Sequence, residues 1–240
     1  MARLLPKAER DTFRPWFYYF FEKFVAALMR RAFARFELIG ELPPLPEPGI
    51  PLLFLANHIS WWDGFFLWRL QQRWMRRSPI YTVMLAGEFQ KFSFFGRVGA
   101  LPLTLGSPAS LRCLLRLLQK LRLKHQARRW SLSYFAQGRI RPSFSRPLAL
   151  SRGVLHAAEA MSPSYIIPVA LHIEFLNKQR PTVFMQLGQA RYYPDPTLTL
   201  EELELELTQT LDGIHRLVSE FGEDYNKALD EKGMAHACLL

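Results

Sequence analysis

Short apolar runs alternate with amphipathic helical patterns from residue 50 onward, and this alternation constrains the fold more than any other feature of the chain. Short apolar runs are typical of buried strands, and here they occupy residues 50–56, 80–86, 100–104, 130–136, 166–175 and 182–188. Helical patterns follow or separate them, at residues 64–76, 107–126, 152–161 and 200–229. Strands that alternate with helices form a largely parallel sheet. The sequence therefore predicts an α/β fold, with a mostly parallel sheet flanked by helices.

The N-terminal segment, residues 15–36, is rich in aromatic and basic side chains and predicts an amphipathic helical appendage. The longest stretch without a charge is Pro15–Phe21, far shorter than the roughly 20 apolar residues that a membrane-spanning helix needs. A helix of this kind is typical of an anchor in the membrane interface, although packing against the rest of the chain would produce the same pattern. The predicted apolar face holds Phe21, Val25, Leu28, Ala32 and Phe36.

Five prolines in residues 41–51 predict a stiff linker after this helix. The chain is thereby divided into an N-terminal amphipathic membrane-associating helix, residues 1–40, and an α/β domain, residues 41–240. Cys113 and Cys238 provide neither a disulfide framework nor a metal cluster. Nothing resembles the short apolar segment and cleavage site of a signal peptide. We expect a protein without a bound metal, attached peripherally to the cytoplasmic face of a membrane.

His58 and Asp63 form a suggestive polar pair, because they follow directly after the apolar run at residues 50–56. Asp63 is the only acid between residues 47 and 88, and His58 is the first histidine of the chain. A neutral imidazole can take the proton from an alcohol while a carboxylate on its other nitrogen fixes the tautomer. The pair therefore predicts hydroxyl activation without a protein nucleophile. The alternative is a surface histidine at a strand end and an aspartate that caps the next helix.

The stretch from Asn57 to Asp63 reads NHxxxxD, and it resembles the hallmark of the glycerol-phosphate and lysophosphatidate acyltransferase family. Three further blocks stand in the order of that family. Residues 87–96 resemble its ELxxxPFFG segment, and residues 134–139 stand where FPEGTR is expected. Residues 166–169 match a late strand that has a proline between hydrophobic residues. One block alone would be a weak signal, whereas four in order identify a member of the family.

This resemblance implies an O-acyltransferase that moves a fatty acyl group from a thioester donor, acyl-CoA or acyl carrier protein, to a hydroxyl of a lipid acceptor, with no further cofactor. It implies that His58 is the catalytic base and that Asp63 orients it. Loops of open α/β sheets converge beyond the carboxyl ends of the strands, where His58, Glu88 and Gly138 would each fall. Substrate-binding roles are implied for Asn57, Glu88, Gln137, Gly138, Arg139 and Arg141.

Two of the blocks depart from the family pattern at positions that the family associates with the phosphate of the acceptor. Leu105 stands where an arginine is usual, and Ala136 and Gln137 replace proline and glutamate. Glutamine keeps the hydrogen-bonding shape of glutamate but lacks its charge. Arg139 and Arg141 carry guanidinium groups that can hold an anion, or they belong to a solvated basic loop. The acceptor is therefore either a glycolipid or glycosylated isoprenoid, or a lysophospholipid held by these arginines.

Several residues near the motifs have two interpretations. Ser60 is interpreted as a helix N-cap more readily than as a catalytic group. The aromatic pairs at residues 61–62 and 94–95 line an acyl-chain groove or pack in the core. Gly138 donates its N–H to an oxyanion or only forms a turn. The other histidines lack a carboxylate at a useful spacing, so we expect them to be structural or surface residues.

The net charge of +10 is concentrated in one segment: residues 89–158 contain 13 Lys or Arg and no acid, whereas residues 195–231 are acid-rich. A basic face attracts an anionic membrane surface, an acyl carrier protein or a CoA tail, and the other interpretation is a solubilising surface. Nucleic acid is not an expected partner, because no nucleic-acid-binding motif accompanies the charge. A hydrolase would need a GxSxG nucleophile elbow, which is absent. The remaining alternative function is a non-catalytic, membrane-associated lipid-binding protein.

Overall fold

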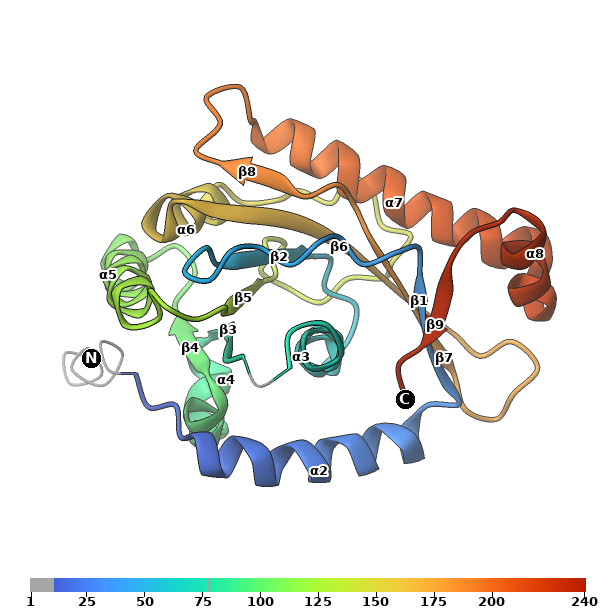
Figure 1. The fold of residues 1–240 in the computed structure, drawn as a ribbon, viewed down its shortest axis with the longest axis horizontal. Coiled ribbons are helices and arrows are strands. Elements are labelled where there is room, and N and C mark those ends of the chain that lie inside the picture. Colours follow the sequence, from blue (N-terminus) through green and yellow to red (C-terminus); the bar gives the residue numbers. More distant parts are fainter. Residues whose placement is uncertain (1–10, 77) are drawn as a thin grey trace.

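The computed structural model describes residues 11–76 and 78–240, and it contains the α/β architecture that the alternating pattern predicts (Figure 1). The described strands are β1 (Arg35–Ile39), β2 (Leu52–Ala56), β3 (Ile80–Leu85), β4 (Ala100–Leu103), β5 (Ser131–Tyr134), β6 (Ser164–Glu174), β7 (Thr182–Leu187), β8 (Arg191–Tyr193) and β9 (His236–Cys238). They form one nine-stranded sheet in the order β4-β3-β5-β2-β6-β7-β1-β9, with β8 paired to β6.

The sheet is mostly parallel, as predicted. β4, β3, β5, β2 and β6 all run in one direction, and β1 is parallel to β7. The antiparallel pairs are β6 with β7, β6 with β8, and β1 with β9. The carboxyl ends of five neighbouring parallel strands therefore meet at one edge, which is where α/β proteins place their sites.

Helices cover both faces of the sheet, and each face has its own hydrophobic core. The helices are α2 (Pro15–Ala32), α3 (Asp63–Trp74), α4 (Ala86–Lys91), α5 (Pro108–Lys124), α6 (Gly153–Met161), α7 (Leu200–Phe221) and α8 (Tyr225–Glu231), with 3₁₀ turns η1 (Ser93–Val98) and η2 (Gly222–Asp224). Side chains of α5, α6, α7 and α8 form the core on one face. Those of α2 and α3 form the core on the other face. In Figure 1, α2 runs along the bottom of the molecule and α7 along the top, with the sheet between them.

Local sequence explains where α5 and α7 begin. Ser107 Oγ accepts the N–H of Ser110, and Pro108 occupies the first turn of α5, as predicted. Thr199 and Glu202 form a capping box at the start of α7, in which each side chain accepts a backbone N–H of the other residue. Leucines at helical spacing then bury one face of each helix against the sheet.

The N-terminal helix is present, but it ends earlier than predicted. α2 ends at Ala32, and residues 35–39 form β1, which pairs in parallel with β7. Phe36 is buried in the strand, and it would also fit the predicted helical stripe, so its hydrophobicity could not distinguish the two. The boundary predicted at residue 40 therefore leaves one strand of the main sheet on its N-terminal side.

The buried face of α2 also differs from the predicted one. Tyr18, Val25 and Met29 are buried, whereas Leu28 is exposed. The helix packs against α3 through Tyr18, whose ring lies 5.7 Å from that of Trp68. This contact rotates the outer aromatic residues toward solvent. Among the described helices, none is long and apolar enough to cross a membrane.

The last predicted helix, residues 200–229, is divided at Gly222. Gly222 has φ +49°, in the left-handed region that glycine adopts at little cost, and the chain turns there into η2 and α8. The short elements β8, β9 and α4 were not predicted, because three to six residues are too few to show a periodic pattern.

Candidate active site

Asn57 fixes the point at which the chain leaves β2. Its side-chain amide donates to the carbonyl of Leu171 at 2.9 Å and accepts the N–H of Leu171 at 2.8 Å. Asn57 is buried, and Leu171 lies on β6 beyond the last residue that pairs with β2. Both polar groups of the side chain are thus used to tie the loop to the sheet. Asn57 therefore holds the shape of this loop, and its substrate-binding role stays a prediction.

His58 and Asp63 lie together, as the general-base hypothesis requires. His58 Nδ1 is 2.7 Å from Asp63 Oδ2, and the Asp63 side chain is fully buried. The same Oδ2 accepts the backbone N–H groups of Ile59 at 2.6 Å and Ser60 at 3.0 Å. Because a carboxylate oxygen that collects donors in this way acts as the acceptor, Nδ1 carries the hydrogen. His58 Nε2 is then the nitrogen whose lone pair can take a proton.

Ser60 completes the support of Asp63. Its Oγ donates to Asp63 Oδ1 at 2.5 Å and accepts the N–H of Trp62 at 3.1 Å. The N-cap residue of α3 is Trp62, so the predicted N-cap role of Ser60 is wrong. Sequence reasoning missed its actual role because the contact depends on a tight turn that returns residue 60 to the start of α3.

The loop after β5 holds His58 from the other side. Gln137 Oε1 accepts the N–H of His58 at 2.7 Å, and the N–H of Arg141 donates to the His58 carbonyl at 2.8 Å. The ring of Phe135 stacks on the imidazole, with centroids 4.5 Å apart and planes 24° apart. The Gln137 contact needs only an acceptor oxygen, so an amide serves there as well as a carboxylate. Phe135 belongs to the block at residues 134–139, but the sequence analysis had given it no role in the site.

A cavity of about 470 Å³ opens beside the imidazole, and its walls are mostly apolar. It is bounded by α2, α3, η1 and the strands β3 and β4. Aromatic rings form much of one wall, with Trp61, Phe65 and Phe95 in mutual contact. Of the aromatic pairs that sequence analysis left open, Trp61 and Phe95 therefore line a cavity. The other lining residues that bear on function are Phe21, His58, Glu88, Leu105, Gly138, Arg139 and Ile140.

Of the remaining predicted substrate-binding residues, three line the cavity and Arg141 does not. Glu88, Gly138 and Arg139 line the cavity together with His58, so three of the predicted loops do converge. Glu88 is paired with Lys91 at 2.7 Å. The guanidinium of Arg141 donates instead to the carbonyl of Pro147 at 3.2 Å, and Arg141 does not line the cavity. Arg139 is therefore the better placed of the two arginines for an anionic group in the cavity.

Leu105 occupies the wall next to Gly138. Gly138 has φ +67°, and a Cβ at this position would lie 3.1 Å from Leu105 Cδ1. A side chain at residue 138 would therefore strain the backbone and crowd Leu105. Where the family pattern has an arginine, this chain thus presents an apolar surface to the cavity. Within residues 11–76 and 78–240, no cluster of three or more His, Cys, Asp or Glu side chains is arranged to hold a metal ion.

Comparison with known proteins assigns this chain to a family. A family model described as Acyltransferase matches residues 39–172, which is more than half of the chain and includes His58, Asp63 and nearly the whole cavity wall. The chain belongs to the acyltransferase family.

A solved structure with a similar fold is the 1-acyl-sn-glycerophosphate (LPA) acyltransferase PlsC from Thermotoga maritima. The two chains are 15% identical, with a TM-score of 0.55, and the match covers 91% of this chain and 81% of that one. At this identity the likeness establishes the fold. A search among curated proteins finds no match.

Proposed function

We propose that this protein transfers a fatty acyl group from a thioester donor to a hydroxyl of a lipid acceptor, with His58 as the general base. The observation that carries the proposal is the His58–Asp63 pair, in which an imidazole with a fixed Nδ1 hydrogen faces an apolar cavity. Membership of the acyltransferase family supports the reaction class. A non-catalytic lipid-binding protein would have no use for the four hydrogen bonds that hold Asp63 behind the imidazole.

The proposed reaction needs no covalent intermediate on the protein. His58 Nε2 takes the proton of the acceptor hydroxyl as its oxygen attacks the thioester carbonyl, and Asp63 stabilises the imidazolium that forms. Collapse of the tetrahedral intermediate breaks the carbon–sulfur bond and forms the ester. The imidazolium then returns its proton to the departing thiolate. The apolar cavity wall excludes water, which would otherwise compete with the acceptor for the acyl group.

The cavity fits the hydrocarbon chain of a lipid substrate. Its volume of about 470 Å³ lies within the usual range for small-molecule sites, and its wall is mostly apolar. Phe21 of α2 lines the cavity and its ring lies 6.0 Å from that of Phe95, so an acyl chain can enter from the side of the molecule on which α2 lies. The thioester carbonyl would then rest near His58, where the cavity wall includes Gly138 and the charged Arg139.

The acceptor is proposed to lack a phosphomonoester next to its reacting hydroxyl. Leu105 provides no charge where the family pattern has an arginine, and Gln137 is engaged with the backbone of His58. Arg139 is the guanidinium that lines the cavity, and it can hold either a phosphate of the donor or an anionic group of the lipid. A glycolipid or glycosylated isoprenoid fits this arrangement better than a lysophosphatidate. PlsC of Thermotoga maritima, by its own description, acts on lysophosphatidate.

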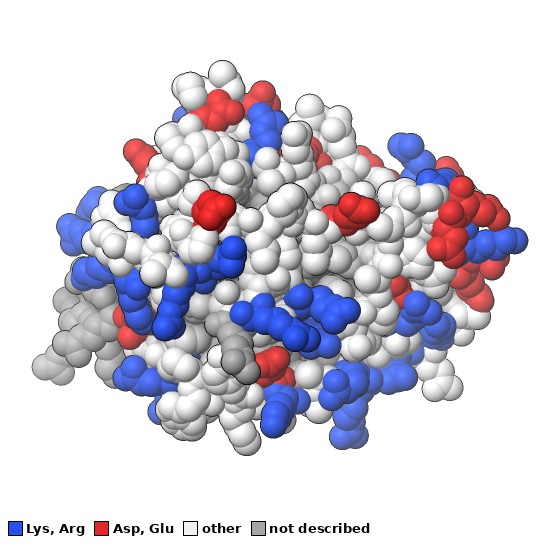
Figure 2. Space-filling model, viewed as in Figure 1, with Lys and Arg blue, Asp and Glu red and all other residues white. Residues whose placement is uncertain are grey.

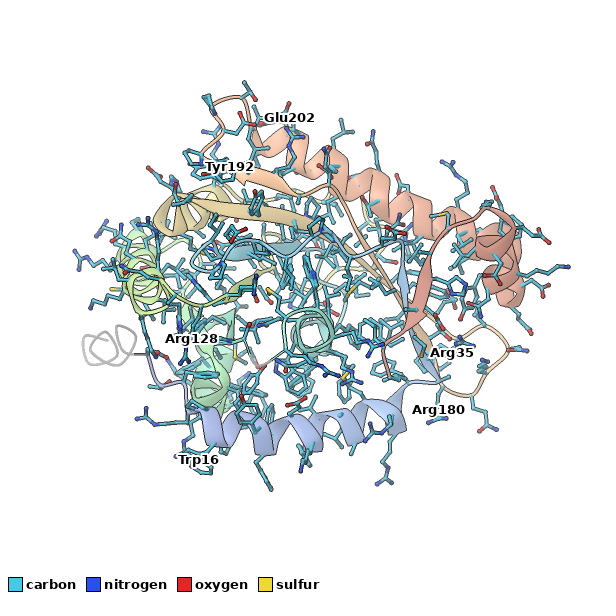
Figure 3. All side chains as sticks on the ribbon, in the orientation of Figure 1. Trp16, Arg35, Arg128, Arg180, Tyr192 and Glu202 are labelled. Atoms are coloured by element: carbon cyan, nitrogen blue, oxygen red, sulfur yellow. The ribbon has the colours of Figure 1, made fainter. Side chains whose placement is uncertain are left out.

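The outer face of α2 is proposed to bind an anionic membrane surface. Its exposed apolar side chains are Trp16, Tyr19, Phe20, Phe24 and Leu28, and Lys23 and Arg31 are exposed among them. Figure 3 shows Trp16 on the side of α2 away from the sheet. Figure 2 shows lysines and arginines along the same edge, whereas acidic side chains gather at the end of the molecule near α8. Aromatic and basic residues on one exposed face are typical of helices that lie in the interface. The proposed location is therefore the cytoplasmic face of a membrane, with peripheral attachment.

The donor is proposed to be acyl-CoA or acyl carrier protein, and the basic surface supports both. On α5, exposed Arg112, Arg116 and Lys120 share one side of the helix, and the helix begins three residues after Leu105 of the cavity wall. Such a surface attracts an acidic carrier protein or the phosphates of CoA.

A single assay tests the proposed function. Purified full-length protein in mixed vesicles is given matched acyl-CoA and acyl-carrier-protein donors, with lysophosphatidate, other lysophospholipids and glycolipids as acceptors. We expect an ester product that depends on the thioester and on His58. Absence of any product from wild-type protein that binds these vesicles would favour the lipid-binding alternative.

A further inference from the structure

The loop between β5 and α6, residues 135–152, touches the catalytic pair on one side and the body of the protein on the other. Toward the pair, Gln137 and Arg141 bind the two backbone groups of His58, and Phe135 stacks on its ring. The imidazole therefore keeps its position only while this loop keeps its own. The contacts that hold the other side of the loop to the body of the protein therefore affect the position of the imidazole and hence the reaction.

Ser143 fastens the far side of the loop to two histidines. Its Oγ lies 2.9 Å from His172 Nδ1 and 3.1 Å from His215 Nε2. The two imidazole rings are 4.8 Å apart and nearly perpendicular, at 77°. His172 belongs to β6 and His215 to α7. One hydroxyl therefore joins the loop, the sheet and the covering helix.

Both imidazole rings are in a protonation state that allows each to form a hydrogen bond with a serine hydroxyl between them. Burial lowers the pKa of His172 to about 4, with a smaller contribution from His215, while Glu174 opposes the shift. Burial and then Arg146 lower the pKa of His215, while Asp212 opposes the shift. Both rings are therefore neutral at pH 7, and each has one N–H and one lone pair. A hydroxyl can donate to one ring and accept from the other, so Ser143 satisfies both.

Neighbouring contacts extend this attachment along the loop. Arg146 pairs with Asp212 of α7 and donates to the carbonyls of Ser143 at 2.7 Å and Ser145 at 2.9 Å. Glu204, also on α7, accepts two backbone N–H groups of residues 149–150, at 2.8 and 3.0 Å. The hydroxyl of Ser143 is nevertheless the contact that lies nearest in sequence to Arg141 and His58.

The same short segment of β6 anchors both sides of the site. The backbone of Leu171 holds Asn57, which precedes His58, and the side chain of the next residue, His172, holds Ser143. The loop that carries His58 and the loop after β5 are thus both anchored to β6, at two adjacent residues of that strand. Removal of the Ser143 hydroxyl would release the loop after β5 but not the loop that carries His58. The angle between the imidazole and the substrate would then change.

We propose that Ser143, His172 and His215 are positioning residues for acyl transfer, acting through the loop at residues 135–152 on His58. The inference rests on the proposed function, because it assigns these residues to the same reaction. Misplacement of a catalytic group by a fraction of an ångström lowers the rate of the chemical step more than it weakens substrate binding.

The kinetic test compares three serine variants of the full-length protein. Ser143→Ala should lower kcat about tenfold, the effect of one strong net hydrogen bond, with a smaller change in KM. Ser143→Thr keeps the hydroxyl and should restore kcat to within about twofold of wild type. Ser145→Ala is the matched control, because Ser145 lies in the same loop and its hydroxyl makes no hydrogen bond among the described residues. His215→Phe keeps a ring but removes its nitrogens, and it should reproduce the loss.

A second readout follows the loop itself and does not require activity. Amide hydrogen exchange in residues 137–146 should quicken in Ser143→Ala and His215→Phe, while exchange in α5 stays unchanged. Equal kcat for Ser143→Ala and Ser145→Ala would overturn the proposal, as would failure of Ser143→Thr to restore kcat. A loss of kcat that merely follows a lower Tm would also overturn it. If wild-type protein transfers no acyl group, the proposed function fails, and the exchange measurement still decides whether Ser143 holds the loop.

Discussion

Asp63 is the residue on which the electrostatics of the site depend. Its carboxylate is buried, yet it accepts hydrogen bonds from the backbone of Ile59 and Ser60, the hydroxyl of Ser60 and the imidazole of His58. It is also the first residue of α3, where the helix dipole favours a negative charge. A buried carboxylate without such partners would cost several kcal/mol. The same donors would be left unpaired if the carboxylate were removed.

Replacement of the proposed base is expected to abolish transfer. General-base catalysis contributes about 10²- to 10⁴-fold, so His58→Ala should reduce turnover by at least about 100-fold. Asp63→Asn keeps the shape of the side chain but can present a donor to Nδ1, so it should lower kcat without unfolding the protein. Turnover is measured with purified variants whose folding is checked by circular dichroism. His156→Ala, at an exposed position on α6, is the control, and near-normal turnover by folded His58→Ala would falsify the assignment.

The choice of acceptor is expected to depend on Leu105. An unpaired phosphate loses a contact worth about 1.5–3 kcal/mol, so lysophosphatidate should be a poorer acceptor than a glycolipid by about 10- to 150-fold. Leu105→Arg should narrow this gap, because it restores a cation beside Gly138. Competition between the two acceptors in one vesicle preparation measures the ratio. If lysophosphatidate is the best acceptor of wild type and Arg139→Ala raises its KM, Arg139 has taken over the phosphate and the proposed acceptor is wrong.

At the scale of elements, α2 has one face that is buried in the core and one face that is exposed. One face packs on α3 through Tyr18, and with Val25 and Met29 it belongs to the core below the sheet. The opposite face exposes aromatic rings, with Trp16 at 70% and Phe20 at 71% of their full exposure. Of the two explanations that the sequence left open, packing against the rest of the chain therefore holds for the inner face, and an anchor in the membrane interface stays a prediction for the outer face.

Membrane binding is expected to depend on the outer face of α2. Deleting the helix would also remove core residues, so Trp16→Ser and Phe20→Ser are the suitable changes. They should weaken co-sedimentation with anionic vesicles, and binding of the wild type should fall as salt rises, since each basic residue near the surface contributes about 1 kcal/mol. Leu205→Ser, also at an exposed position but on α7 across the sheet, is the control. Undiminished sedimentation of the α2 variants would show that the helix has only a packing role.

At the scale of the whole molecule, two histidines lie against the core on the α5–α8 face of the sheet: His125 is buried beside Trp130, and the partly buried His172 stacks on Phe184. Burial lowers the pKa of His125 to about 4, and its Nε2 lies 3.1 Å from the hydroxyl of Tyr81. Burial likewise lowers the pKa of His172 to about 4. Both values lie well below the ordinary histidine pKa of 6.5. At a pH between about 4 and 6.5, these two histidines are therefore protonated in the unfolded chain but not in the folded chain.

Stability is therefore expected to fall as the pH drops from about 6.5 to about 4. A lowered histidine pKa favours the folded state fully above 6.5, and each group can remove up to about 3 kcal/mol of unfolding free energy by pH 4. Denaturant unfolding between pH 7 and pH 4 measures the slope. His125→Gln should make the slope shallower, whereas His156→Gln, at an exposed position, should leave it unchanged. Equal slopes for wild type and His125→Gln would contradict this prediction.

Local and periodic features of the sequence determined the class of fold and the contact between His58 and Asp63, the proposed catalytic pair. Alternation of apolar runs and helical patterns gives the parallel sheet, because each run is long enough for one strand and each helix covers the sheet with one face. The spacing of His58 and Asp63 places them at the two ends of the short loop between β2 and α3, so their contact needs no distant part of the chain. The caps of α5 and α7 are local in the same way.

Only the tertiary structure decided which distant residues meet the pair. Phe135 and Gln137 reach His58 because β5 lies beside β2 in the sheet, and strand order is not encoded in any local pattern. The division of residues 15–39 into α2 and β1 was likewise decided by pairing with β7, which offers unpaired backbone groups to the chain at residue 35. Ser143 and its two histidines are spread over residues 143–215, and their contact exists because β6 and α7 pack against each other. Side-chain periodicity reports which face of an element is buried, but not which other element buries it.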